Sequence, residues 1–137
     1  IKLYNLIMKF FSKNKNFFYL INLCLIFFYI FPGSLLGLVI YNDIKLQPQI
    51  TSNFIISSNH FYAFMIISVI GFFTFIELKQ IKFLIIYLVL LSVTLELLHL
   101  IIPQRSFEWT DLFGNLLGVI VVIFVNNLIN KYGVFKK

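Results

Sequence analysis

Four long apolar stretches, separated by polar connections, constrain this chain more than any other feature of its sequence. They cover residues 17–41, 59–76, 83–102 and 112–129. A helix needs about 20 mostly apolar residues to cross the hydrocarbon core of a bilayer. The sequence therefore predicts an all-α integral membrane protein, a bundle of four transmembrane helices that forms one domain over residues 1–137.

The composition supports this class. Hydrophobic residues make up 61% of the 137 residues and charged residues 12%, whereas a soluble domain is usually about half apolar and a quarter charged. A soluble domain of this length has too little interior to bury so much apolar surface. We therefore expect membrane lipids to surround the helices.

The first stretch contains the segment Phe31-Pro32-Gly33-Ser34. Proline lacks a backbone N–H, and in a transmembrane helix it often introduces a kink without ending the helix. We expect one kinked span, because a helix that stopped at Phe31 would be short for a bilayer. The alternative is a short helix to Phe31 followed by a re-entrant turn. A cleaved signal peptide is not expected, because the run is long and lacks a small-x-small cleavage site.

The basic residues predict the orientation, because loops on the cytoplasmic side of a membrane are enriched in Lys and Arg. Two of them, Lys45 and Arg105, lie in the connections after the first and third stretches. The other nine precede the first stretch, join the second to the third, or follow the fourth: Lys2, Lys9, Lys13, Lys15, Lys79, Lys82, Lys131, Lys136 and Lys137. Both termini are therefore expected in the cytoplasm.

The net charge of +6 does not indicate nucleic-acid binding. That function needs a concentrated basic face or stripe, and here the basic residues lie between hydrophobic runs. We expect no nucleic-acid partner.

The single cysteine, Cys24, has no partner for an intrachain disulfide.

Several polar and ionisable residues fall at the outer ends of the predicted spans. Glu96 and His99 are three residues apart and so share a helical face, and Asp111 and Asn115 share another. An ionisable side chain at membrane depth is costly and so marks a candidate functional site. The predicted ligand-binding cluster consists of His60, Glu96, His99, Arg105, Asp111 and Asn115.

The spacing of these residues resembles the signature of the VanZ-like family of small bacterial membrane proteins. The matching pattern runs from Glu-x-x-His at 96–99, through Pro-x-Arg-Ser-Phe at 103–107, to Asp-x-x-x-Asn-x-x-Gly at 111–118, with a His-Phe pair at 60–61. The chain departs from the family at His99, where Gln is usual, and at 56–57, where an Asp-Lys pair is usual. The resemblance implies a multi-pass protein of the bacterial cytoplasmic (inner) membrane with a role in the cell envelope.

Each candidate also has a simpler structural interpretation. We expect Glu96 and Arg105 either to form an ion pair that fixes the third helix to the following loop, or to line an outward-facing pocket. The Gly-x-x-x-Gly spacings at 33–37 and 114–118 favour close helix packing. Within one chain, we expect internal packing and not dimerisation.

Metal binding and catalysis are not expected. Di-iron bundles need two Glu-x-x-His motifs and two further Glu residues, and this chain has one such motif. His60 and His99 with Glu96 or Asp111 supply ligand types that suit zinc, but the family usually has Gln where His99 stands. Ser106 has no histidine fixed beside it by the sequence. A Glu96–His99 acid–base pair is the one catalytic alternative, and we predict no catalytic residue and no cofactor.

Two functions from different classes remain. In the first, the chain is an envelope protein that binds a polar lipid head group or a lipid-linked ligand in an outward-facing pocket. In the second, it is a structural accessory subunit packed against a larger membrane protein complex. A proton or ion pathway is disfavoured, because no polar residue continues a path from Glu96 into the inner half of the bundle.

Overall fold

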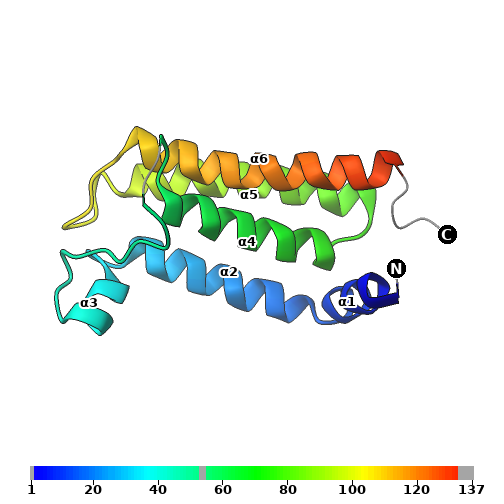
Figure 1. The fold of residues 1–137 in the computed structure, drawn as a ribbon, viewed down its shortest axis with the longest axis horizontal. Helices are drawn as coiled ribbons and strands as arrows, with labels where there is room; N and C mark the ends of the chain where they lie inside the picture. The colour runs from blue at the N-terminus through cyan, green and yellow to red at the C-terminus, as the bar shows by residue number, and fades with distance from the viewer. Residues whose placement is uncertain (1, 53–54, 133–137) are drawn as a thin grey trace.

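The computed structural model describes residues 2–52 and 55–132, and all regular secondary structure in these residues is helical. The prediction of an all-α fold is confirmed. Four of the helices lie side by side along the long axis, while the other two lie at opposite ends of the molecule (Figure 1). The helices are α1 (Lys2–Lys13), α2 (Lys15–Ile30), α3 (Leu35–Tyr41), α4 (Ser58–Thr74), α5 (Leu78–Leu98) and α6 (Trp109–Tyr132).

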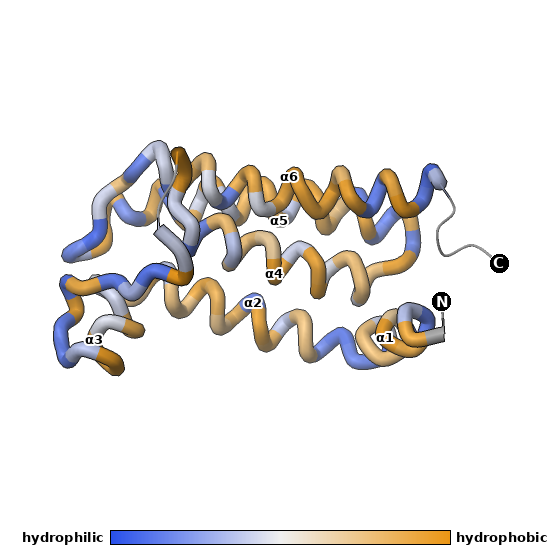
Figure 2. Tube along the Cα trace, viewed as in Figure 1, coloured by the Kyte–Doolittle hydropathy of each residue, from blue (hydrophilic) through white to orange (hydrophobic). Residues whose placement is uncertain are grey.

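Two or three of these helices are suited to cross a membrane. α5 and α6, with 21 and 24 residues, are long and apolar enough, and α2 with α3 adds a third if this bent pair counts as one span. α4 is apolar but has 17 residues, which makes it about 25 Å long against a hydrocarbon core of about 30 Å. Figure 2 shows the hydrophobic middle of the bundle between more hydrophilic ends. Length and composition thus support fewer spans than the predicted four.

The first stretch is not one kinked helix, so this prediction is wrong. α2 ends at Ile30, and α3 begins at Leu35 after a bend of 80°. Phe31 is extended, with φ −65° and ψ 131°, because a following proline disfavours the helical conformation. Gly33 then adopts a φ of 75°, which is strained for other residues. The side chain of Ser34 accepts a hydrogen bond from Gly37 N and caps the start of α3.

The other boundaries shift by a few residues. α5 begins at Leu78, so residues 78–82, which were expected in the connection, form its first turn. The same helix ends at Leu98, and α6 extends from Trp109 to Tyr132, beyond the predicted limits at both ends.

α1 was not predicted at all. Phe11 stacks on Phe73 near the end of α4, whereas Leu3, Leu6 and Phe10 are exposed on the adjacent part of the helix surface. Exposed apolar side chains beside lysines are typical of helices that lie in a membrane interface.

The centre of the bundle is a close contact between α4 and α6. A Cβ atom added at Gly118 would lie 2.5 Å from Phe61 O and 2.9 Å from Met65 N, and one at Gly114 would lie 2.8 Å from Ser57 O. Internal packing, as expected for this glycine pair, is confirmed. The contact places the first turns of α4 and α6 against each other.

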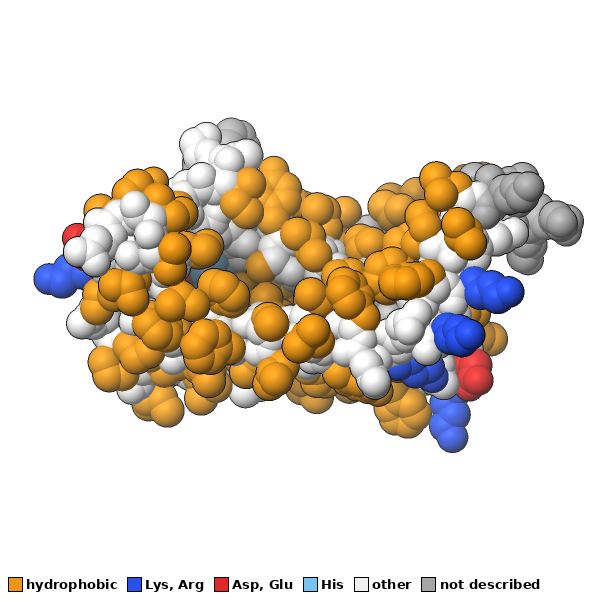
Figure 3. All heavy atoms as spheres, turned by 90° about the horizontal axis from the view of Figure 1, so that it is seen from below, with side chains coloured by type: hydrophobic (Ala, Val, Ile, Leu, Met, Phe, Trp, Pro, Cys, Tyr) orange, Lys and Arg blue, Asp and Glu red, His pale blue; other side chains and the backbone are white. Residues whose placement is uncertain are grey.

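Apolar side chains also cover much of the outer surface. Leu20, Leu23 and Phe27 of α2 are each more than half exposed. Figure 3 shows apolar side chains along the length of one face, with most of the charged side chains at the two ends. This distribution suits a chain whose middle part is surrounded by lipid.

Candidate functional site

The side chain of His60 lies between two carboxylates. Its Nε2 atom is 3.3 Å from Asp111 Oδ2, and its Nδ1 atom is 3.8 Å from Glu96 Oε2. His60 stands in the first turn of α4, Asp111 in the first turn of α6, and Glu96 in the last turn of α5. The alternating directions of these helices bring the three turns to the same end of the bundle (Figure 1). His60 and Glu96 are buried, and Asp111 is partly buried.

Glu96 is held from two further directions. His99 Nδ1 lies 3.3 Å from Glu96 Oε2, as the predicted shared helical face requires. Glu96 Oε1 accepts a hydrogen bond of 3.0 Å from the backbone N–H of Glu108. Glu96 is therefore fully buried and tied to the connection between α5 and α6.

Tyr29 lies at the centre of the cluster, and the sequence analysis missed it. Its hydroxyl donates a hydrogen bond of 2.7 Å to Asn115 Oδ1. Its ring stacks on His99, with centroids 5.8 Å apart and planes at 14°, and meets the edge of His60 at 5.1 Å. The sequence carries no signal that separates Tyr29 from Tyr19, which occurs in the same apolar run and is exposed.

Arg105 does not form the expected ion pair with Glu96. Among the described residues, the ion pairs of Glu96 are with His60 and His99. The Arg105 guanidinium instead donates from Nη2 to Phe28 O at 3.1 Å and from Nε to Phe31 O at 3.3 Å. These carbonyls need external donors because α2 ends at Ile30. Burial lowers the pKa of Arg105, but an arginine side chain remains charged in proteins.

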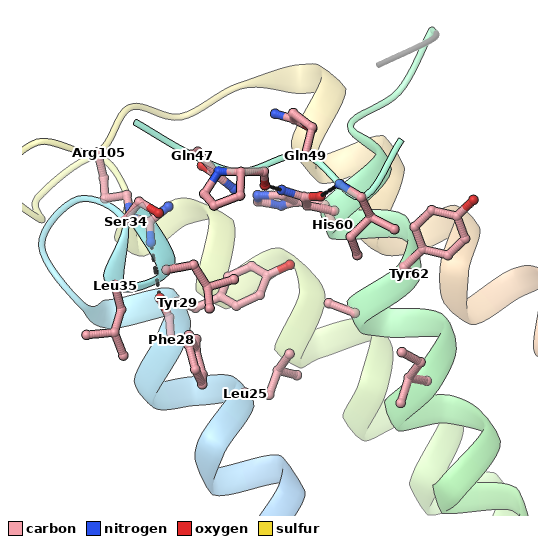
Figure 4. Close-up of a pocket in the computed structure, with 16 residues that line it drawn as sticks. Leu25, Phe28, Tyr29, Ser34, Leu35, Gln47, Gln49, His60, Tyr62 and Arg105 are labelled. Carbon is pink, nitrogen blue, oxygen red and sulfur yellow. Dashed lines mark hydrogen bonds between the residues drawn. The ribbon is translucent and has the colours of Figure 1, made fainter. Parts of the chain in front are cut away.

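Two cavities meet beside this cluster. The first is polar, has a volume of about 420 Å³ and is lined in part by Lys45, His99 and Asp111. The second is a mainly apolar groove of about 390 Å³ between α2 and α4. Figure 4 shows this groove, with Leu25, Phe28 and Tyr62 along it and His60 and Arg105 at its polar end. The residues that line both cavities are Ser34, Gln47 and Arg105.

The structure thus gathers five of the six predicted residues around Tyr29: His60, Glu96, His99, Asp111 and Asn115. Arg105 stands at the edge of the cluster, where it holds the end of α2. Ser34, Lys45 and Gln47 were not predicted as cavity residues. Ser34 precedes α3 and the other two follow it, so their positions depend on the break at Pro32. No protein-family model, no curated protein and no solved structure matches this chain.

Proposed function

We propose that this chain is a VanZ-like protein of the bacterial cell envelope that binds the polar head group of a lipid, or a lipid-linked ligand, in an outward-facing pocket. The motif spacing supports the family, and the buried ionisable cluster supports a ligand site. The cluster contains no nucleophile that has both a base and a residue orienting that base beside it. The function we propose is therefore binding and not catalysis.

The proposal includes four membrane crossings in the cytoplasmic membrane with both termini in the cytoplasm. α2 and α3 form one broken span, and α4, α5 and α6 are the others. A bilayer thins around a short helix at modest cost, so the 17 residues of α4 are compatible with a crossing. The nine-to-two distribution of basic residues supports the orientation. Two of the nine, Lys136 and Lys137, lie outside the described residues.

The observation that carries the proposal is the junction of the two cavities at Arg105. A lipid combines an apolar chain with a polar head, and here an apolar groove adjoins a polar cavity. A guanidinium has five N–H donors, and the hydrogen bonds to Phe28 O and Phe31 O use two of them. The remaining donors suit a phosphate or carboxylate, which arginine binds with paired N–H groups.

Native mass spectrometry of the protein, purified from bacterial membranes in a mild detergent, tests the proposal. We expect a bound lipid whose affinity, obtained from its occupancy, falls about fivefold in Lys45→Gln, since one lysine near an anionic head group contributes about 1 kcal/mol. Lys45 lines the polar cavity and its side chain is exposed, so its replacement leaves the fold intact. Lys79→Gln, at the opposite end of the bundle, is the matched control. Equal lipid occupancy in both variants would contradict the pocket.

A structural accessory subunit is the second candidate, and the hydrogen bonds of Arg105 and His99 to α2 favour it. Arg105 bonds to Phe28 O and Phe31 O, and His99 Nε2 lies 3.2 Å from Tyr29 O, so these side chains already have packing roles. A subunit of this kind would migrate in a stoichiometric assembly after mild solubilisation. The pocket hypothesis predicts a separate protein with bound lipid.

A further inference from the structure

The geometry points to a divalent metal site formed by His60, Glu96 and Asp111. Each residue offers one ligand atom, and these atoms lie within 4.8 Å of one another. One imidazole nitrogen and two carboxylates form a ligand set that suits Zn²⁺ or Mn²⁺. The set comes from three helices, α4, α5 and α6, so it exists only in the folded chain.

Two of the three residues carry buried atoms that lack a hydrogen-bond partner. Neither Glu96 Oε2 nor His60 Nδ1 makes a well-aligned hydrogen bond, although Glu96 is fully buried and His60 is 5% exposed. The polar neighbours of Glu96 Oε2 are His99 Nδ1 at 3.3 Å and His60 Nδ1 at 3.8 Å. A buried carboxylate oxygen without a hydrogen bond is costly. A metal ion bound to Glu96 would remove that cost for the carboxylate.

The distance between His60 and Asp111 already matches that of a coordination shell. Two ligand atoms on a tetrahedral ion, each about 2.1 Å from the metal, are about 3.4 Å apart. His60 Nε2 and Asp111 Oδ2 already stand 3.3 Å apart. The third ligand atom, on Glu96, lies within 4.8 Å of the other two. To reach the spacing of about 3.4 Å, it has to move closer to them by about 1.4 Å at most.

His99 occupies the position of a supporting residue around such a site. Its Nδ1 lies 3.3 Å from Glu96 Oε2, and its ring is fixed by stacking on Tyr29. Groups that orient metal ligands are typical of metal centres. The three ligands do not include His99, so the Gln that the VanZ-like family usually has at this position is no argument against a metal.

An ion can reach the site, because His60 lines the apolar groove and Asp111 lines the polar cavity. A divalent ion on Glu96 and Asp111 would offset two negative charges beside the cavity that Lys45 and Arg105 also line. It would therefore favour an anionic head group there. This last consequence rests on the proposed function, whereas the metal site itself does not.

The test uses the full chain in detergent, freed of lipid and dialysed against Zn²⁺ or Mn²⁺ alone. Elemental analysis should show one bound ion per chain, with affinity at least tenfold lower in Asp111→Asn and in Glu96→Gln. Glu108→Gln removes an exposed carboxylate of the adjacent loop and should bind as the unmodified chain does. His99→Gln keeps a polar side chain beside Glu96 and should retain one ion per chain.

A spectroscopic readout on the unmodified chain protects the test against variants that fail to fold. With Mn²⁺ bound, electron spin echo modulation should report one directly coordinated histidine nitrogen, and His60→Asn should remove it. Binding of less than one ion per chain, absence of nitrogen coupling, or equal loss in Glu108→Gln would overturn the site. Lipid occupancy measured without metal remains a separate result, so failure of the metal site and failure of the head-group pocket are distinguishable.

Discussion

Arg105 Nη2 donates a hydrogen bond of 3.1 Å to the backbone carbonyl of Phe28, and this contact joins the α5–α6 connection to the end of α2. Phe31 O accepts from Nε of the same guanidinium, and Tyr29 O lies 3.2 Å from His99 Nε2. The proline break leaves these carbonyls without helical partners, and such groups are tolerated at membrane depth only when they are satisfied by the protein. The break in the first apolar stretch and the cluster of polar residues are thus parts of one arrangement.

Replacement of Arg105 by lysine should lower stability. Lysine is a compact cation on a flexible stem and cannot reproduce the fixed fork that spans two carbonyls. Loss of one hydrogen bond from a charged donor costs about 1.5–3 kcal/mol. We expect a lower thermal unfolding midpoint in detergent for Arg105→Lys and an unchanged one for Lys79→Arg, an exposed control. Equal midpoints would show that Arg105 does not hold the end of α2.

Removal of the Tyr29 hydroxyl should also destabilise the bundle. In Tyr29→Phe the ring remains, but Asn115 Oδ1, which is fully buried, loses its donor. A buried acceptor left without a partner costs about 1–3 kcal/mol. Tyr41→Phe, at an exposed position, is the control. In a double-mutant cycle with Asn115→Ala, strict additivity of the two losses would contradict a direct hydrogen bond.

Sequence alone could predict the helical class and the polar cluster, because hydrophobic run length and residue spacing determine both. The Glu96–His99 pair follows from helical periodicity, and the His60–Asp111 contact follows from helices that start at the same end of the bundle. The partner of Arg105 could not be predicted, since it depends on where α2 ends. α2 ends where it does because Pro32 has no N–H to continue the helix and because side chains from other parts of the fold supply the hydrogen-bond donors that its last carbonyls need.

Tyr29 was missed for a similar reason. Its hydroxyl reaches Asn115 on α6 only because α2 packs against α4 with one particular rotation about its own axis. An apolar run with no polar face contains no periodic signal for that rotation. α4 also ends at Thr74, two residues before the end of the predicted stretch, because hydropathy gives a run of apolar residues and not the point at which the helix stops.

The proposed topology predicts which positions an impermeant thiol reagent can reach on intact cells. Cysteines introduced at Ser52 and Lys79, both exposed, would report the two ends of the bundle in a chain that carries Cys24→Ser. We expect labelling at 52 and none at 79 until the membrane is permeabilised. The reverse pattern would contradict the orientation, and labelling at both positions would contradict an odd number of crossings between them.

Alanine at Gly118 should separate α4 from α6 and so disturb the whole cluster. The added Cβ would stand 2.5 Å from Phe61 O and 2.9 Å from Met65 N, both backbone atoms, so no flexible side chain can move aside. Overpacking of this kind typically costs about 1–3 kcal/mol, and we expect a clearly lower thermal midpoint in detergent. The same strain should move Asp111 away from His60 and weaken metal binding, because both residues stand on the two helices that are forced apart. Leu117→Ala, at a neighbouring position that is 40% exposed, is the control and should change both quantities little. An unchanged midpoint in Gly118→Ala would mean that the two helices do not approach this closely.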